Sequence, residues 1–159
     1  KGENVMLGYW NNEEETKKVL KDGWLHTGDI GIFENGYLKI TDRKKDILIT
    51  PGGDNISPVK IENELSNSKF IDQSIVYGDN KPYLVALLVL SEDNLKITQD
   101  QIKKEVDNIN KSLSRIENIK KFFVINEKFS IENGMLTPTL KLKRYKIVQK
   151  YKNEFEKLY

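Results

Sequence analysis

The sequence predicts an α+β protein: a small domain over 45–159, with a three-stranded sheet and flanking helices, preceded by a β-hairpin segment within 1–44. Asn35-Gly36 lies between two runs rich in β-branched and aromatic residues, a strong signal for a two-residue hairpin turn. Leu84–Leu90 is apolar throughout, as expected of a central strand covered on both faces. Helical and strand-like segments alternate around this run, which indicates one mixed domain.

A short helix is predicted near the start of the chain, with Asn11 or Asn12 as its N-cap. Glutamates occupy its first turn, and lysines lie near its end, which suits the helix dipole and gives Glu–Lys pairs four residues apart. Gly23 is expected to end it. Tyr9, Trp10 and Trp24 are interpreted as packing anchors.

Strands are then predicted on both sides of the Asn35-Gly36 turn, from Trp24 to Glu34 and from Tyr37 to Asp42. Such a hairpin can hold Asp29 and Arg43 at a fixed separation, which recognition of a polar small molecule requires. The alternative is a surface hairpin whose charges are solvated. His26 has no neighbouring nucleophile and is interpreted as a structural residue of this segment.

A strand at 46–50 is expected to end in a loop at Pro51-Gly52-Gly53. Ser57 is a good helix N-cap, because Pro58 at the first helical position needs no N–H partner there. Ile61 and Leu65, one helical turn apart, are expected on the inner face of this helix.

Paired strands are predicted over 71–78 and 83–90, across a turn at 79–82. Thr98 should open a long helix, with Gln101 as its capping-box partner. Its apolar residues recur at alternating spacings of four and three, giving one apolar stripe. The stripe consists of Ile102, Val106, Ile109, Leu113 and Ile116.

The third strand of this region is predicted over 122–125, and Asn133-Gly134 marks a turn. Pro138 prevents a helix from running through the segment that follows the turn. A last helix is expected to start near Leu142. The residues predicted to share its inner face are Tyr145, Val148, Tyr151, Phe155 and Leu158.

Composition excludes several classes of function. Cysteine is absent and there is one histidine, so a disulfide framework, a thiolate metal site and a histidine-based metal site are not expected. A net charge of +2 gives no argument for nucleic acid as a partner. No apolar run reaches membrane-spanning length. Because the chain starts at Lys1 without methionine, we interpret it as an excised fragment.

Distinctive motifs follow one another along nearly the whole chain. They are Asn4–Trp10, Gly23–Asp29, Gly36–Leu38, Asp42–Asp46, Pro51–Pro58, Ile61-Glu62 and Leu136–Lys143. In this order they resemble the adenylate-forming superfamily, which includes acyl-CoA synthetases, luciferases and peptide-synthetase adenylation domains. The sequences of the Asp42–Asp46 and Gly52–Pro58 segments are most similar to those of long-chain fatty acid CoA ligases. The resemblance implies the end of a large N-terminal adenylation domain at 1–44 and a C-terminal lid domain at 45–159.

The resemblance implies roles for residues of the first motifs. Asp29 would bind the ATP ribose, since a carboxylate can accept hydrogen bonds from both hydroxyls of a diol; its alternative is a turn aspartate. Arg43 would contact the nucleotide, and its alternative is a surface salt bridge with Asp42 or Asp46. Lys45 matches the hinge position, with a solvated lysine as the alternative.

The loop of Gly52, Gly53, Asp54 and Asn55 would lie beside the passage for the pantetheine arm of CoA in the thioester-forming pose. Glycines allow close backbone approach to a ligand. A plain turn before a capped helix is the alternative interpretation of this loop.

Lys143 is the predicted catalytic lysine, which would reach the carboxylate and the α-phosphate while the acyl-adenylate forms. The commoner motif of the family is Pro-x-Thr-x-Ser-Gly-Lys, and this sequence lacks its serine and glycine. Alignment on Thr139 selects Lys143, and Lys141 remains a competitor. The alternative is a solvated basic helix start formed by Lys141, Arg144, Lys146 and Lys150. CoA phosphates or an anionic membrane surface are further candidate partners of this basic cluster.

The implied activity is AMP-forming synthesis of acyl-CoA from fatty acid, ATP and CoA, with Mg²⁺ accompanying ATP. The fragment alone is expected to be inactive and to need the missing N-terminal domain as its partner. The implied location is cytoplasmic or peripherally membrane-associated. Two rivals remain: an adenylating enzyme that loads a carrier protein, and a non-catalytic interaction domain that kept the fold.

Overall fold

Two compact units make up the structure, and each is described by itself. The computed structural model describes residues 1–91 and 97–159. The N-terminal unit is Lys1–Asp46 and the C-terminal unit is Ile47–Tyr159. These names are kept below.

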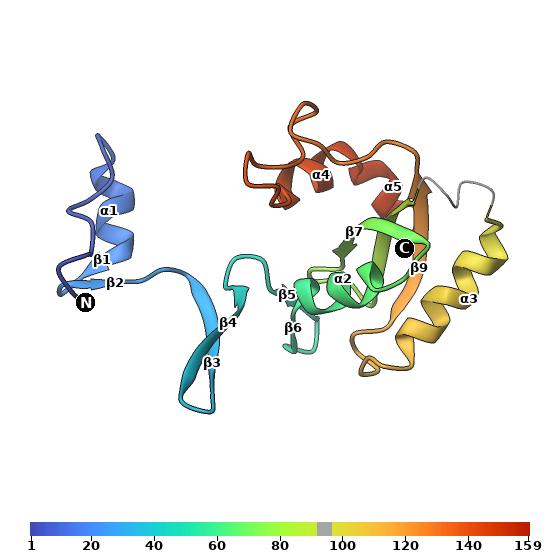
Figure 1. Cartoon of the computed structure of the whole chain (residues 1–159), viewed down its shortest axis with the longest axis horizontal. Helices are drawn as coiled ribbons and strands as arrows, with labels where there is room; N and C mark the ends of the chain where they lie inside the picture. Colours follow the sequence, from blue (N-terminus) through green and yellow to red (C-terminus); the bar gives the residue numbers. More distant parts are fainter. Residues whose placement is uncertain (92–96) are drawn as a thin grey trace. The chain divides into compact units, whose positions relative to one another are not determined.

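A three-stranded sheet lies at the centre of the C-terminal unit (Figure 1). Its middle strand, β8 (Leu84–Leu90), pairs antiparallel with β7 (Ile71–Tyr77) and parallel with β9 (Ile119–Ile125). All seven residues of β8 are buried, as its continuous apolar run predicts. The predicted α+β fold with a three-stranded sheet is therefore confirmed.

Helices cover both faces of this sheet. Because side chains alternate along a strand, Leu84, Ala86, Leu88 and Leu90 of β8 enter one hydrophobic cluster, and Val85, Leu87 and Val89 enter another. The first cluster is closed by α2 (Pro58–Ser66) and α3 (Gln99–Asn110). The second is closed by α4 (Arg144–Lys150) and α5 (Lys152–Glu156), on the opposite side of the sheet in Figure 1.

The predicted starts of α2 and α3 are confirmed. Ser57 Oγ accepts a hydrogen bond from Lys60 N–H at 3.1 Å, with Pro58 as the first helical residue. Thr98 and Gln101 form the reciprocal capping box, in which Thr98 N–H donates to Gln101 Oε1 at 2.9 Å. Ile61 and Leu65 are fully buried.

The predicted extents of two helices are wrong. α3 ends at Asn110, so Ile116 lies beyond it and is 48% exposed. The last helix is divided at Tyr151 into α4 and α5. Tyr145 is 68% exposed and Ile147 is buried in its place, because the helix phase is set by Arg144, which turns inward as described below.

In the N-terminal unit, helix α1 is followed by two short antiparallel pairs of strands. Their bounds are α1 Glu13–Val19, β1 Leu20–Lys21, β2 Trp24–Leu25, β3 Asp29–Glu34 and β4 Tyr37–Arg43. Asn12, and not Asn11, caps α1 by accepting from Glu15 N–H at 3.1 Å. At its other end, α1 stops at Val19 and β1 follows at once. The prediction that Gly23 ends this helix is therefore wrong.

The Asn35-Gly36 turn is confirmed, with φ of 51° and 82°, the positive values of a type I′ hairpin turn. The single strand predicted from Trp24 to Glu34 is wrong. It is interrupted between β2 and β3, where Gly28 has a φ of 74°, a value that extended strands do not adopt.

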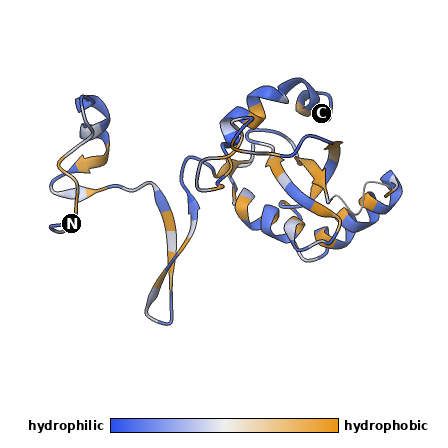
Figure 2. Cartoon of the chain, turned by 45° about the horizontal axis from the view of Figure 1, so that its top comes forward, coloured by the Kyte–Doolittle hydropathy of each residue, from blue (hydrophilic) through white to orange (hydrophobic). Residues whose placement is uncertain are grey.

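None of the residues from Lys1 to Asp46 is buried. The β3–β4 hairpin exposes large apolar side chains along its length. Figure 2 shows hydrophobic stretches of the hairpin in orange. They are Ile30, Ile32, Phe33, Tyr37, Leu38 and Ile40. The residues expected to be packing anchors are exposed as well, with Trp10 at 91%, Trp24 at 58% and Tyr9 at 50%, so none of them is buried among the described residues.

Candidate functional site

Asp29 and Arg43 are brought together across the β3–β4 hairpin, in the N-terminal unit. They are register partners near the open end of the ladder, and Arg43 Nε lies 2.8 Å from Asp29 Oδ1. Arg43 thus forms its salt bridge with Asp29. The alternative interpretation had placed that salt bridge with Asp42 or Asp46. Because the bond uses Nε, the terminal guanidinium nitrogens and Asp29 Oδ2 have no partner among the described residues and can face a ligand.

Lys45 lies in a tight turn that leads out of β4. Asp46 N–H donates to Arg43 O at 2.9 Å, which makes Lys44 and Lys45 the central residues of the turn. The boundary between the two compact units follows directly, between Asp46 and Ile47. A rotation of the backbone here would change the direction in which the C-terminal unit leaves the hairpin.

The glycine loop connects β5 (Leu48–Ile49) to β6 (Asn55–Ile56) in the C-terminal unit. Thr50 closes it: Thr50 N–H donates to Asp54 O at 3.0 Å, and Thr50 Oγ1 lies 3.1 Å from Asp54 Oδ2. Only one glycine is required by the backbone. Gly53 has a φ of 88°, whereas a methyl group at Gly52 would make only ordinary contacts.

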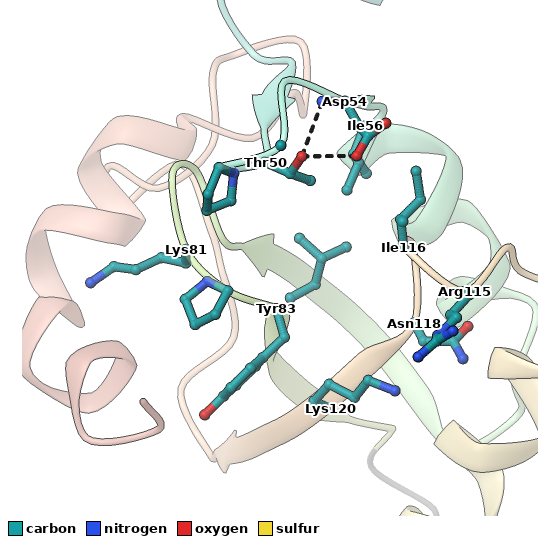
Figure 3. Close-up of a pocket in the computed structure, with 13 residues that line it drawn as sticks. Thr50, Asp54, Ile56, Lys81, Tyr83, Arg115, Ile116, Asn118 and Lys120 are labelled. Atoms are coloured by element: carbon teal, nitrogen blue, oxygen red, sulfur yellow. Dashed lines mark hydrogen bonds between the residues drawn. The ribbon is translucent and has the colours of Figure 1, made fainter.

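A pocket of about 690 Å³ opens beside this loop (Figure 3). Gly52 and Asp54 line it, whereas Gly53 and Asn55 do not. Its floor is apolar, with the buried side chains of Ile56 and Leu84. The structure therefore places part of the predicted loop at a half-open hollow, whose volume lies in the range of small-molecule sites.

The predicted catalytic segment forms a second, tightly closed loop. An isolated antiparallel bridge joins Leu136 to Leu142, and Thr137 N–H donates to Lys141 O at 2.8 Å. Lys143 N–H donates to Met135 O at 2.8 Å, just before α4 begins. Lys141 is exposed and Lys143 is half-buried. Neither ammonium group has an ion pair among the described residues.

Arg144 anchors the end of this loop to the core. Its guanidinium donates two hydrogen bonds to the Glu62 carboxylate of α2, of 2.8 and 2.7 Å, and a third to Val76 O at 3.1 Å. Val76 N–H of β7 donates to the same carboxylate at 2.7 Å. The two side chains are only 17% and 9% exposed. The interpretation of Arg144 as part of a solvated basic face is therefore wrong.

The described residues offer no metal site and no membrane span. Within 1–91 and 97–159, no three His, Cys, Asp or Glu side chains gather closely enough to hold a metal ion. No helix in these ranges has both the length and the apolar character needed to cross a bilayer.

A protein-family model described as the AMP-binding enzyme C-terminal domain matches residues 45–159. This chain belongs to that family. The match confirms the resemblance predicted from the motifs, and the sheet with helices on both faces is the structure of the C-terminal domain in this chain.

Curated relatives match the chain from end to end. The long-chain-fatty-acid–CoA ligase FadD15 of Mycobacterium tuberculosis is 34% identical over 100% of this chain, which spans 30% of that protein. The long-chain-fatty-acid–CoA ligase 5 of Rattus norvegicus is 40% identical over 100% of this chain, which spans 27% of that protein. The chain thus spans less than a third of the length of these relatives.

Solved structures of adenylating enzymes share the fold. The adenylation domain of a carboxylate reductase from Mycobacterium chelonae matches with a TM-score of 0.90 and 28% identity, over 100% of this chain and 27% of that one. O-succinylbenzoate CoA synthetase from Bacillus subtilis, solved with its acyl-adenylate intermediate, matches with a TM-score of 0.73 and 28% identity, over 92% of this chain and 29% of that one.

Several polar residues of the C-terminal domain were missed by sequence reasoning. Glu62 was noted only as part of a motif, although a charged residue on the inner side of an amphipathic helix is a signal for a buried partner. Arg115 and Lys120, which line the pocket of the glycine loop, carried no motif. Their only signal was one cation in the turns after α3, Arg115, and one at the start of β9, Lys120.

Proposed function

We propose that this chain is the C-terminal part of an AMP-forming long-chain fatty acid CoA ligase, acting with an upstream adenylating domain. In the first step, a carboxylate oxygen of the fatty acid attacks the α-phosphorus of ATP, which forms the acyl-adenylate and releases pyrophosphate. In the second step, the sulfur of CoA loses its proton and attacks the acyl carbonyl carbon, and AMP leaves. The chain alone is expected to catalyse neither step.

The observation that carries the proposal is the closed loop of 136–143, called the lysine loop below. Glu62 and Arg144 anchor it, in a chain similar to ligases over its whole length. The closed loop offers Lys143, or its competitor Lys141, as a positive charge on a fixed support. Placed beside the α-phosphate, that charge would stabilise the negative charge that develops during adenylation. Arg144 acts as a positioning residue, since it holds the first turn of α4 directly after Lys143.

In the N-terminal unit, Asp29 and Arg43 are proposed to hold the nucleotide. Asp29 Oδ2 would accept hydrogen bonds from the ribose hydroxyls, and the terminal nitrogens of Arg43 would donate to ribose or phosphate oxygens. Their mutual salt bridge fixes both side chains before the ligand arrives.

The second step needs the lysine loop withdrawn and the thiol admitted. We assign the hinge to Lys45, in the turn that joins the two compact units. The loop of Gly52, Gly53, Asp54 and Asn55 would then face the CoA arm. Within 1–91 and 97–159, no cluster of acidic side chains is present that would hold the Mg²⁺ expected with ATP.

The test is a comparison of the two half-reactions in a full-length protein that carries this chain. We expect Lys143→Ala to lower fatty-acid-dependent ATP–pyrophosphate exchange by about 10²-fold or more, because it removes a group aimed at developing charge. Thioester formation from supplied acyl-adenylate should change far less. Lys146→Ala, an exposed cation of the same helix, is the matched control.

Lys141→Ala decides between the two lysines in the same assay. If it alone abolishes exchange, Lys141 is the catalytic residue and the rest of the proposal stands. If neither variant affects exchange, the C-terminal domain is a non-catalytic interaction domain and the proposal fails.

A second candidate acceptor is a carrier protein instead of free CoA. It is supported by the likeness to the adenylation–carrier didomain of carboxylic acid reductase from Segniliparus rugosus, which matches with a TM-score of 0.87 and 26% identity over 100% of this chain and 24% of that one. Assays of the full-length protein with free CoA and with a phosphopantetheinylated carrier protein separate the two. Transfer to the carrier alone would replace the CoA ligase proposal.

A further inference from the structure

Asn133 makes hydrogen bonds on both sides of the turn that leads into the lysine loop. Its side-chain oxygen, Oδ1, accepts from Ser130 N–H at 3.0 Å and from Met135 N–H at 3.2 Å. Its side-chain nitrogen, Nδ2, donates to Lys128 O at 2.7 Å and to Glu127 Oε1 at 3.4 Å. One exposed asparagine therefore connects residues that precede the turn with the first residue after it.

Met135 passes this restraint on to the two candidate lysines. Its side chain is buried, and its carbonyl oxygen accepts a hydrogen bond from Lys143 N–H at 2.8 Å. Next to this bond, Thr137 N–H donates to Lys141 O at 2.8 Å. The backbone of both lysines is thus bonded to a segment whose first residue, Met135, is held by Asn133.

Glu127 fixes the other side of the Asn133 turn to the last helices. Its carboxylate accepts hydrogen bonds from the Lys150 ammonium and the Tyr151 hydroxyl, at the point where α4 is divided from α5. These bonds hold the pKa of Glu127 below the ordinary carboxyl value of 4.5, so the group is ionised near neutral pH. An ionised carboxylate is the stronger acceptor for the Asn133 amide.

The chain before this turn is held to the core independently of Asn133. Phe129 is 2% exposed. The Gln73 side chain of β7 bonds its backbone twice: Gln73 Nε2 donates to Phe129 O at 3.0 Å, and Phe129 N–H donates to Gln73 Oε1 at 2.7 Å. Because these contacts secure the chain without Asn133, loss of the Asn133 amide should loosen the lysine loop and leave the rest of the domain folded.

We propose that Asn133 is a positioning residue for adenylation, which holds the beginning of the lysine loop as Arg144 holds its end. The inference rests on the proposed function, in which a lysine of this loop meets the α-phosphate. Asn133 touches no substrate in this assignment and acts through the backbone of Met135. A misplacement of about 1 Å can lower a rate by about 10²-fold, so the bonds of one asparagine are enough to control the adenylation step.

The two half-reactions of the full-length protein separate positioning from folding. Asn133→Ala should lower the kcat of fatty-acid-dependent ATP–pyrophosphate exchange about tenfold or more. The KM for ATP should not change, since the nucleotide is assigned to Asp29 and Arg43. Thioester formation from supplied acyl-adenylate should keep its rate. Equal losses in both half-reactions would mean a merely structural role and would overturn the proposal, as would no loss of ATP–pyrophosphate exchange.

Two further variants identify the bond that matters. Asn133→Asp keeps an oxygen that can accept from Ser130 and Met135, and it should retain most of the ATP–pyrophosphate exchange. A loss as large as that of Asn133→Ala would overturn the assignment. Asn108→Ala is the matched control, because it removes an exposed amide that bonds Lys111 at the end of α3, on the other face of the sheet. A comparable loss from this control would show that the effect is not specific to the turn, and would also overturn the proposal.

Amide hydrogen exchange in the 159-residue chain tests the same support without activity. Asn133→Ala should speed hydrogen exchange at Lys143 and Thr137, whose amides are bonded within the loop region, by about tenfold. The amides of the fully buried β8, which are expected to exchange through global unfolding, should change less. Equal acceleration at all these amides, or none at Lys143, would overturn the proposal.

The outcomes also separate this inference from the proposed function. If Lys143→Ala or Lys141→Ala lowers ATP–pyrophosphate exchange and Asn133→Ala does not, the function stands and the inference fails. If the Lys143 amide loosens in Asn133→Ala but neither lysine variant lowers ATP–pyrophosphate exchange, the proposed function fails, although Asn133 still supports the loop.

Discussion

The two compact units differ in how they bury their side chains. In the C-terminal unit, hydrophobic clusters lie on both faces of β8, every residue of which is buried. In the N-terminal unit, none of the residues from Lys1 to Asp46 is buried, and the β3–β4 hairpin is apolar and exposed. Extended apolar surface of this kind marks a face that another surface covers. The C-terminal unit thus has hydrophobic clusters of its own, whereas the N-terminal unit has no buried residue.

The largest expected effect is from truncating matched aromatic residues in the two units. Phe155→Ala should lower the free energy of unfolding by about 3–5 kcal/mol, because it opens a cavity in a fully buried cluster. Phe33→Ala should change it by less than about 0.5 kcal/mol, since the ring is exposed. Urea unfolding of the 159-residue chain, followed by circular dichroism, measures both. A large loss from Phe33→Ala would show that the hairpin has a core of its own.

The buried pair of Glu62 and Arg144 should come next. Arg144→Met leaves a buried carboxylate without its main partner, so we expect a loss of about 3 kcal/mol or more. The matched change in the N-terminal unit is Arg43→Met, whose partly exposed pair with Asp29 should contribute no more than about 1 kcal/mol. Chemical unfolding gives both values. Equal losses would contradict the contrast between a buried and an exposed ion pair.

A smaller effect is expected from the two neighbouring glycines of the pocket loop. Gly53→Ala should cost about 1–2 kcal/mol, because an alanine at a φ of 88° is strained. Gly52→Ala should be nearly neutral, as the added methyl group makes only ordinary contacts. Thermal unfolding of both variants gives the comparison. If Gly52→Ala proved the more damaging, our account of this loop would be wrong.

The smallest effect concerns pH. Burial raises the pKa of Glu117, but hydrogen bonds from Lys60 and Ser114 outweigh it and hold the pKa below the ordinary carboxyl value of 4.5. A carboxyl group whose pKa is lower in the folded than in the unfolded state stabilises the fold at pH values above its unfolded-state pKa. This stability is lost as the pH falls through the folded-state pKa. Lys60→Met should therefore reduce stability near neutral pH and flatten its decline toward acid.

Unfolding in urea at a series of pH values measures this change. The control is Lys17→Met, which removes an exposed pair with Glu13 in the N-terminal unit and should leave the pH profile as it is. A Lys60→Met profile parallel to that of the unchanged protein would contradict the assignment.

Much of the fold could be predicted because its signals are local. The Asn35-Gly36 turn, the Ser57 cap and the Thr98–Gln101 capping box each depend on a few adjacent residues, and all are present. The last helix was harder, because its inward face depends on Arg144 finding Glu62, 82 residues earlier in the chain. Periodicity alone selected Tyr145, since it could not show that a charged residue turns toward the core.

The candidate site was predictable only in part for the same reason. The motifs selected Asp29 and Arg43, and the hairpin register explains why two residues so far apart in sequence touch. Asp54 and Gly52 were found through their motif and do line a pocket. The cations at the far end of that pocket come from a different segment, and only the packing of β9 beside β8 brings Arg115 and Lys120 to it.

Leu140 has a consequence for how the lysine loop works. Its φ of 60° is a left-handed conformation, which a side-chain-bearing residue adopts at a cost of about 1–2 kcal/mol. The surrounding bonds, including Leu140 N–H to Thr137 O at 2.9 Å, keep it there. A glycine at position 140 would remove this backbone strain, but it would also allow the loop more backbone conformations. The leucine therefore restricts the backbone that carries Lys141 and Lys143, so that less backbone entropy would be lost if either lysine bound the proposed α-phosphate.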